Sequence, residues 1–144
     1  MEEVRFYEGR MEVSEATGWV SDDAAGAISL FVGTTRDHFD GKKVVRLEYE
    51  AYKPMALKEM RALVERARAT WDIKKMLVWH RLGVVPVGEA SVVIAVSAER
   101  RANAIRACEF GIEELKRTVP IWKKEVYEDG SVWKANVEAD LVNM

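Results

Sequence analysis

Two stretches of apolar residues at helical spacing limit what this chain can fold into. In residues 54–71 the apolar side chains recur every three or four positions, and Pro54 suits the first turn of a helix. A second stripe runs through residues 101–118 and consists of Ile105, Cys108, Ile112 and Leu115. Pro120 cannot continue a helix, so the second stretch is expected to end before it. The chain is therefore predicted to contain two main helices.

Short runs of the β type surround these helices. Residues 44–51 alternate apolar and polar side chains, and a turn signal at Asp129-Gly130 separates two short runs near the end of the chain. The expected strands cover residues 26–33, 44–51, 73–82, 90–98, 121–127 and 131–134. A polar loop with an Asp-Gly turn signal occupies residues 34–43, and a connection with Gly and Pro occupies residues 83–88.

This order of elements is strand, strand, helix, strand, strand, helix and a final hairpin. Strictly alternating βα units are absent, which predicts an α+β fold with a mixed, mostly antiparallel sheet and both helices on one face. The 144 residues, with no repeat or linker, predict a single domain over residues 1–144. A content of 49% hydrophobic and 32% charged residues excludes a disordered or fibrous chain.

Several function classes are also excluded by composition. A formal net charge of −2 gives no overall basic field, so no nucleic-acid partner is expected. The longest apolar runs, such as residues 92–96, are too short to cross a bilayer, so no membrane partner is expected. The N-terminus lacks the basic start and apolar run of a signal peptide, which predicts a cytoplasmic location.

Charge is unevenly distributed along the chain. Residues 100–124 carry seven basic and three acidic side chains within a chain whose net charge is −2. A local basic patch in an acidic protein indicates a small anionic ligand rather than a long polyanion. A solvated helix face explains the same charges equally well.

The sequence lacks the common nucleotide-binding, zinc-protease and serine-hydrolase motifs. His38 and His80 stand 42 positions apart without a cluster of Cys or carboxylate ligands, so no metal site is expected. His80 is predicted to be structural. Cys108 is the single cysteine, so an internal disulfide is excluded. Its place on an apolar stripe predicts a buried, inert thiol rather than a nucleophile.

Two lysines flank a proline corner in the most informative segment. Lys116 falls in the last turn of the second helix, and Lys123 falls on the strand just after Pro120. Two amines that converge on one partly desolvated pocket have lowered pKa values, so one could serve as a base or a nucleophile. Alternatively, Lys116 merely complements the helix dipole.

Several separated motifs resemble the MoaE family, the large catalytic subunits of molybdopterin synthase. They are Phe31-Val-Gly-Thr-Thr-Arg36, Leu47-Glu-Tyr-Glu-Ala-Tyr52, His80-Arg-Leu-Gly83 with Val85-Pro-Val, Arg101 at the start of the second helix, and Lys116 through Glu125. The resemblance covers about residues 26–136. Each motif is weak alone, but their order and spacing together are specific.

The resemblance implies a sulfurtransferase of molybdenum cofactor biosynthesis that needs no metal or organic cofactor. Family members convert cyclic pyranopterin monophosphate (precursor Z) into molybdopterin by installing two dithiolene sulfurs. The sulfur donor is the C-terminal Gly-Gly thiocarboxylate of a small ubiquitin-like subunit. The family has an α/β-hammerhead fold, and its large subunits form a homodimer that binds one small subunit at each end, giving a heterotetramer.

The resemblance also implies roles for individual residues. Lys116 and Lys123 match the active-site lysines, Arg36 and Arg101 match anion-binding arginines, and Phe31 matches a pocket-lining aromatic residue. Two positions depart from the family pattern. Arg100, which is predicted to bind substrate together with Arg101, stands where many relatives have a histidine that can shuttle a proton. Val137 stands where some relatives have a basic residue that reaches the neighbouring subunit.

Two rival functions remain open at this stage. A non-catalytic scaffold that binds a ubiquitin-like protein would not need both lysines. A sensor of a phosphate-bearing ligand would need Arg36 and Arg101 but no protein partner.

Overall fold

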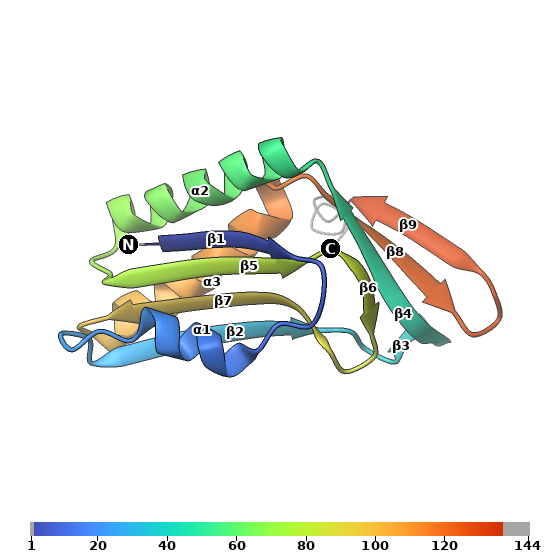
Figure 1. Cartoon of the computed structure of the whole chain (residues 1–144), viewed down its shortest axis with the longest axis horizontal. Helices are drawn as coiled ribbons and strands as arrows, with labels where there is room; N and C mark the ends of the chain where they lie inside the picture. The colour runs from blue at the N-terminus through green and yellow to red at the C-terminus, as the bar shows by residue number, and fades with distance from the viewer. Residues whose placement is uncertain (1, 137–144) are drawn as a thin grey trace.

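Two β-sheets lie side by side in the computed structural model of the chain, which describes residues 2–136 (Figure 1). The strands are β1 (Glu2–Tyr7), β2 (Ala27–Thr34), β3 (His38–Phe39), β4 (Lys42–Ala51), β5 (Lys75–Arg81), β6 (Gly83–Pro86), β7 (Ala90–Ala98), β8 (Ile121–Tyr127) and β9 (Val132–Asn136). The helices are α1 (Val13–Val20), α2 (Lys53–Thr70) and α3 (Arg101–Thr118). The α+β class with a mixed sheet and two main helices is confirmed.

The first sheet has the order β1-β5-β7-β2, and its two central strands are buried on both faces. β1 pairs with β5 in parallel, whereas the β5–β7 and β7–β2 pairs are antiparallel. Alternate side chains of β5 and β7, such as Val78 and Ile94, belong to the main core with α2 and α3. The intervening side chains, such as Trp79 and Val93, pack with α1 in a second cluster.

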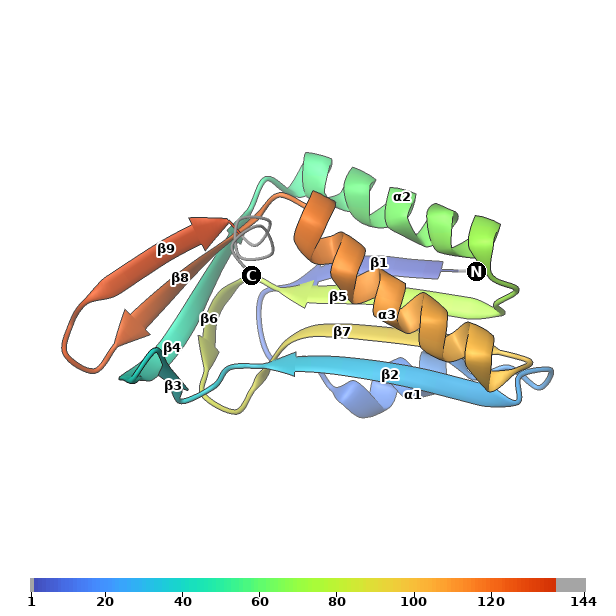
Figure 2. The ribbon, with the colours of Figure 1, turned by 180° about the vertical axis from the view of Figure 1, so that it is seen from behind.

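The prediction that the two main helices share one face is confirmed, because α2 and α3 pack in the same core, whereas α1 is a further helix that was not predicted. Figures 1 and 2 show α1 and α3 on opposite faces of the first sheet. The reason is that both faces of β5 and β7 are apolar, so each face needs a cover. α1 has only eight residues, too short for a clear periodic signal in the sequence.

The second sheet has the order β3-β4-β8-β9, and β6 also pairs with β4. The strand expected over residues 73–82 ends at Arg81, and a turn at Gly83 (φ 85°) starts β6, which was expected to be a connection. The predicted Asp-Gly turn joins β3 to β4, with positive φ at Asp40 (52°) and Gly41 (77°). The expected bounds of β7, α3 and β8 are confirmed.

The chain is tightly packed at Gly26, where β2 begins, and substitution of this glycine tests that packing. A Cβ atom at Gly26 would lie 2.4 Å from the carbonyl oxygen of Glu99, whereas a Cβ at Gly18 in α1 meets nothing within 4 Å. Gly26→Ala should therefore destabilise the chain by about 1–3 kcal/mol, because backbone atoms must shift. Gly18→Ala should stabilise it by about 0.5–1 kcal/mol. Denaturant unfolding checks both, and equal stability of the two variants would contradict the packing described.

Candidate active site

A cavity of about 390 Å³ lies where the two sheets meet the C-terminal end of α3. β2 and the loop after it form one wall, β4 and β8 form another, and α3 closes the third. The charged or titratable side chains in its wall are Arg36, His38, Tyr49, His80, Lys116, Lys123 and Glu125. The apolar part of the wall includes Phe31, Val92 and Leu115.

The pairing of β4 with β8 decides which side chains face this cavity. Tyr49 lies opposite Lys123, and Leu47 lies opposite Glu125. Directly paired residues in an antiparallel sheet point to the same face, so these four side chains share one face. Lys124 lies between Lys123 and Glu125 and therefore points to the other face. Alternation along β8 thus separates two adjacent lysines.

A buried corner brings Lys116 and Lys123 to the same cavity, as the sequence predicts. Val119 and Ile121, on either side of the proline, are both within 1% of complete burial. The Val119 amide donates a hydrogen bond to the Leu115 carbonyl at 3.1 Å, which fixes the end of α3. The chain therefore turns sharply between the two lysines instead of carrying them apart.

Glu125 balances part of the positive charge in the cavity. The Lys123 Nζ lies 3.5 Å from the Glu125 Oε1, and these side chains are only 17% and 5% exposed. The Tyr127 hydroxyl donates to the other carboxylate oxygen at 2.5 Å. Burial, together with this bond to a carboxylate, raises the pKa of Tyr127 to about 12, so the hydroxyl stays a donor at neutral pH.

His80 is a neutral ring in the wall of the cavity. Its Nδ1 lies 2.8 Å from the Arg81 carbonyl oxygen, which can only accept, so Nδ1 carries the hydrogen. Burial, with a smaller contribution from the positive charge of Lys116, lowers the pKa of His80 to about 4, although the hydrogen bond to the Arg81 carbonyl opposes this shift. The ring also makes an edge contact with Tyr49, with centroids 4.9 Å apart. These contacts agree with the structural role predicted for His80.

The buried histidine predicts a specific dependence of stability on pH. The unfolded chain takes up a proton near pH 6.5, whereas native His80 takes it up only near pH 4. Between these values the unfolded state binds more protons, so the free energy of unfolding should fall by up to about 3 kcal/mol as the pH is lowered. Denaturant unfolding at pH 7 and pH 4.5 measures this difference. His80→Phe should flatten the profile, and an unchanged slope would contradict the assignment.

Phe31 and Arg36 come from β2 and the loop after it, and both line the cavity, as expected from the motif that joins them. Arg36 also lies over the ring of Phe39, with its Cζ 5.6 Å from the ring centroid. Tyr49 and Glu125 were not singled out from the sequence. Glu125 could have been predicted from its spacing, because it lies two residues after Lys123 on the same strand and so points to the same face.

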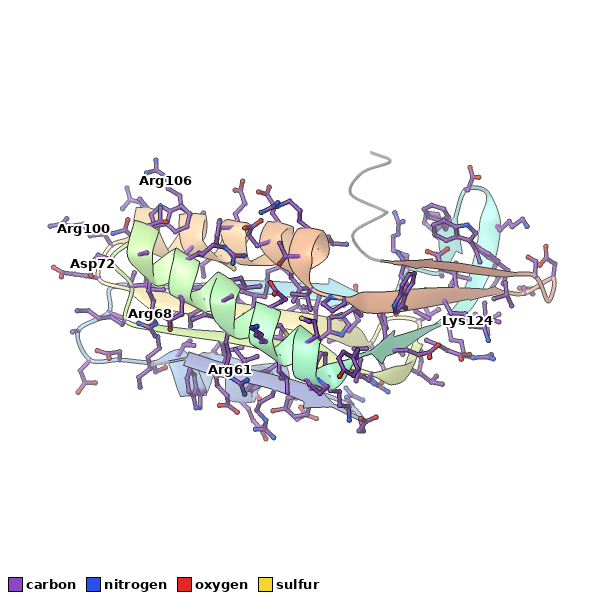
Figure 3. The ribbon with its side chains drawn as sticks, turned by 90° about the horizontal axis from the view of Figure 1, so that it is seen from above. Arg61, Arg68, Asp72, Arg100, Arg106 and Lys124 are labelled. Carbon is purple, nitrogen blue, oxygen red and sulfur yellow. The ribbon has the colours of Figure 1, made fainter. Side chains whose placement is uncertain are left out.

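Arg100 and Arg101 do not lie in this cavity. They stand at the start of α3, and Arg101 lies fifteen residues before Lys116, which corresponds to about 22 Å along a helix. Figure 3 shows Arg100 at the opposite end of the molecule from Lys124, the neighbour of Lys123. One chain therefore does not bring all the sequence-predicted anion-binding residues together. Val137 lies outside the described residues.

Cys108 is buried, and burial raises the pKa of its thiol. Its Sγ lies 3.7 Å from the Ile94 carbonyl oxygen. The predicted burial of this thiol is therefore confirmed.

Among residues 2–136, no three His, Cys, Asp or Glu side chains are grouped to hold a metal ion. Within the same residues, no helix is long and apolar enough to span a membrane.

Comparison with known proteins identifies the family. The family model described as MoaE protein matches residues 7–118. The molybdopterin synthase catalytic subunit 1 of Aedes aegypti is 58% identical over 133 residues, covering 90% of this chain and 86% of the relative. The chain belongs to the MoaE family.

Solved structures agree with this assignment. Molybdopterin synthase from Staphylococcus aureus superposes with a TM-score of 0.84 at 33% identity, covering 92% of this chain and 95% of that one. A Helicobacter pylori structure, described as a complex of subunits 1 and 2 of molybdopterin-converting factor, has the same fold. Its TM-score is 0.75 at 23% identity, covering 92% of this chain and 89% of the other.

Proposed function

We propose that this chain is the catalytic subunit of a molybdopterin synthase. It transfers sulfur from the C-terminal thiocarboxylate of a small ubiquitin-like subunit to precursor Z, and so forms the dithiolene of molybdopterin. Membership of the MoaE family supports this function. The observation that carries it is the convergence of Lys116 and Lys123 in one cavity with Arg36. We also propose that residues 1–144 form one domain and that the protein acts in the cytoplasm.

Each cationic side chain of the cavity has a role that suits an anionic substrate. Arg36 binds the phosphate of precursor Z, because a planar guanidinium can donate two hydrogen bonds to it. Lys116 and Lys123 stabilise the negative charge that develops as sulfur attacks, and they move protons on the pterin side chain. Phe31 supplies an apolar wall beside them. Glu125 holds Lys123 in place through their ion pair.

The sulfur donor enters as an extended tail. A Gly-Gly terminus is narrow enough to thread between walls, and main-chain hydrogen bonds hold such a segment. Its carboxyl-derived end is anionic, so the cluster of cations that binds the phosphate also attracts the tail. A complex with one small subunit per large subunit is consistent with the two-subunit complex described for the Helicobacter pylori relative.

A second copy of the chain is needed for Arg100 and Arg101 to act on the same substrate. β2 is an edge strand of the first sheet, and its Ile28 and Leu30 side chains are 43% and 40% exposed. Gly26, at the start of β2, lies beside Glu99 at the start of α3, so β2 and α3 run in the same direction. Antiparallel pairing of two β2 strands would therefore bring the arginine end of one chain to the lysine end of the other.

Lysine substitutions test the catalytic role. Lys116→Ala should abolish turnover, and Lys123→Ala should lower it on the order of 10²-fold or more, since each removes charge from the transition state. Lys124→Ala is the matched control, because Lys124 points to the opposite face of β8, and it should retain activity. Molybdopterin formation from precursor Z and a thiocarboxylated small subunit is the assay. Wild-type rates in Lys116→Ala would favour the rival function, a non-catalytic scaffold.

Mixed dimers test the contribution of the second chain. Arg101→Ala and Lys116→Ala should each be inactive or weak as homodimers. A heterodimer of the two, isolated with two different affinity tags, should regain activity because one of its two sites has both side chains intact. A heterodimer as weak as its parents would show that Arg101 acts within its own chain or not at the site.

A further inference from the structure

A second hollow of about 700 Å³ continues from the lysine cavity over the same face of the second sheet. It shares Arg36, Phe39, Lys116 and Lys123 with the first cavity. Its remaining wall includes Tyr127 and Trp133 from the β8–β9 hairpin. The volume lies within the range of about 300–1,000 Å³ that is typical of small-molecule sites.

Two aromatic rings meet over this hollow from opposite edges of the sheet. Phe39 belongs to β3 and Trp133 to β9, the first and last strands in the order β3-β4-β8-β9. Their ring centroids are nevertheless only 6.3 Å apart, with 13° between the ring planes. The β3–β4 and β8–β9 hairpins therefore bring their side chains together over the same face. Trp133 lies opposite Glu125 in the ladder, so it projects from the cavity face.

This aromatic pair, Phe39 with Trp133, is not a core contact. Phe39 is 38% exposed and Trp133 is 42% exposed, whereas core side chains in this chain are almost fully covered. Arg36 lies over Phe39 of this pair, and Lys42 lies over Tyr127, another ring of the hollow, at 5.2 Å from the ring centroid. Lys116 and Lys123 also line the hollow, together with one acidic side chain, Asp40. Exposed flat rings beside several positive charges are suited to a ligand that is both planar and anionic.

We propose that the aromatic pair is the stacking surface for the flat pterin ring of the substrate, with Trp133 as its main element. This inference rests on the proposed function, because it places that substrate's ring relative to the lysines. With the ring on Trp133, the phosphate reaches Arg36, and the carbons that receive sulfur lie toward Lys116 and Lys123. The ring binds before and after each sulfur transfer, so the aromatic pair holds the substrate in place while the donor is exchanged.

Substitution of Trp133 tests this assignment against a matched tryptophan. Trp133→Ala should raise the KM for precursor Z about tenfold or more, as loss of a stacking partner does for other flat heterocycles, with a smaller change in kcat. Trp133→Phe should restore most of the affinity. Trp122→Ala is the control: Trp122 is 45% exposed on the same hairpin but on the opposite face of β8, and its KM should match that of the wild type.

A binding measurement separates the ring from the protein partner. Precursor Z should quench the tryptophan fluorescence of the wild type and of Trp122→Phe, and this quenching should be largely lost in Trp133→Phe. Affinity for the small subunit, measured by calorimetry, should be the same in all these variants. An unchanged KM in Trp133→Ala would overturn the inference, as would weaker binding of the small subunit with an unchanged KM. An inactive wild type would instead contradict the proposed function.

Discussion

The antiparallel pairing of β4 with β8 is the interaction on which the site depends. It holds Lys123 opposite Tyr49 and Glu125 opposite Leu47, and so aims a lysine and its carboxylate partner at the first sheet. A shift of this pairing by one residue would turn Lys123 outward and Lys124 inward, because side chains alternate along a strand. The buried residues Val119 and Ile121 prevent such a shift, since they fix the corner between α3 and β8 in the core.

Sequence patterns predicted the elements that carry strong periodic signals. α3 and β7 could be bounded correctly because a stripe, a continuous apolar run and a proline mark their limits. β1 and α1 were not predicted, because six alternating residues and eight weakly periodic residues give little signal by themselves. β6 was not expected because its glycine and proline look like a loop, although its backbone pairs with β4.

Only those parts of the site that are formed by residues close together in the sequence could be predicted. The proline corner indicates that Lys116 and Lys123 converge, because a few residues separate them. The stacking of Phe39 with Trp133 depends on how two hairpins are placed whose rings lie 94 positions apart in the sequence, and no local pattern contains that information. Arg101 and Lys116 are the converse case: their spacing along one helix separates them by about 22 Å, whatever the charges suggest.

The cavity carries a net positive charge, because its cationic side chains outnumber the carboxylate that pairs with one of them. Lys116, Lys123 and Arg36 bring three cations into one partly enclosed space, and Glu125 offsets only one of them. His80 adds no further charge, since burial keeps its ring neutral, and the hydrogen on Nδ1 is donated to the Arg81 carbonyl. A protonated His80 would raise the repulsion among these cations. The neutral ring therefore lets the wall stay polar without adding to the repulsion among the cations of the cavity.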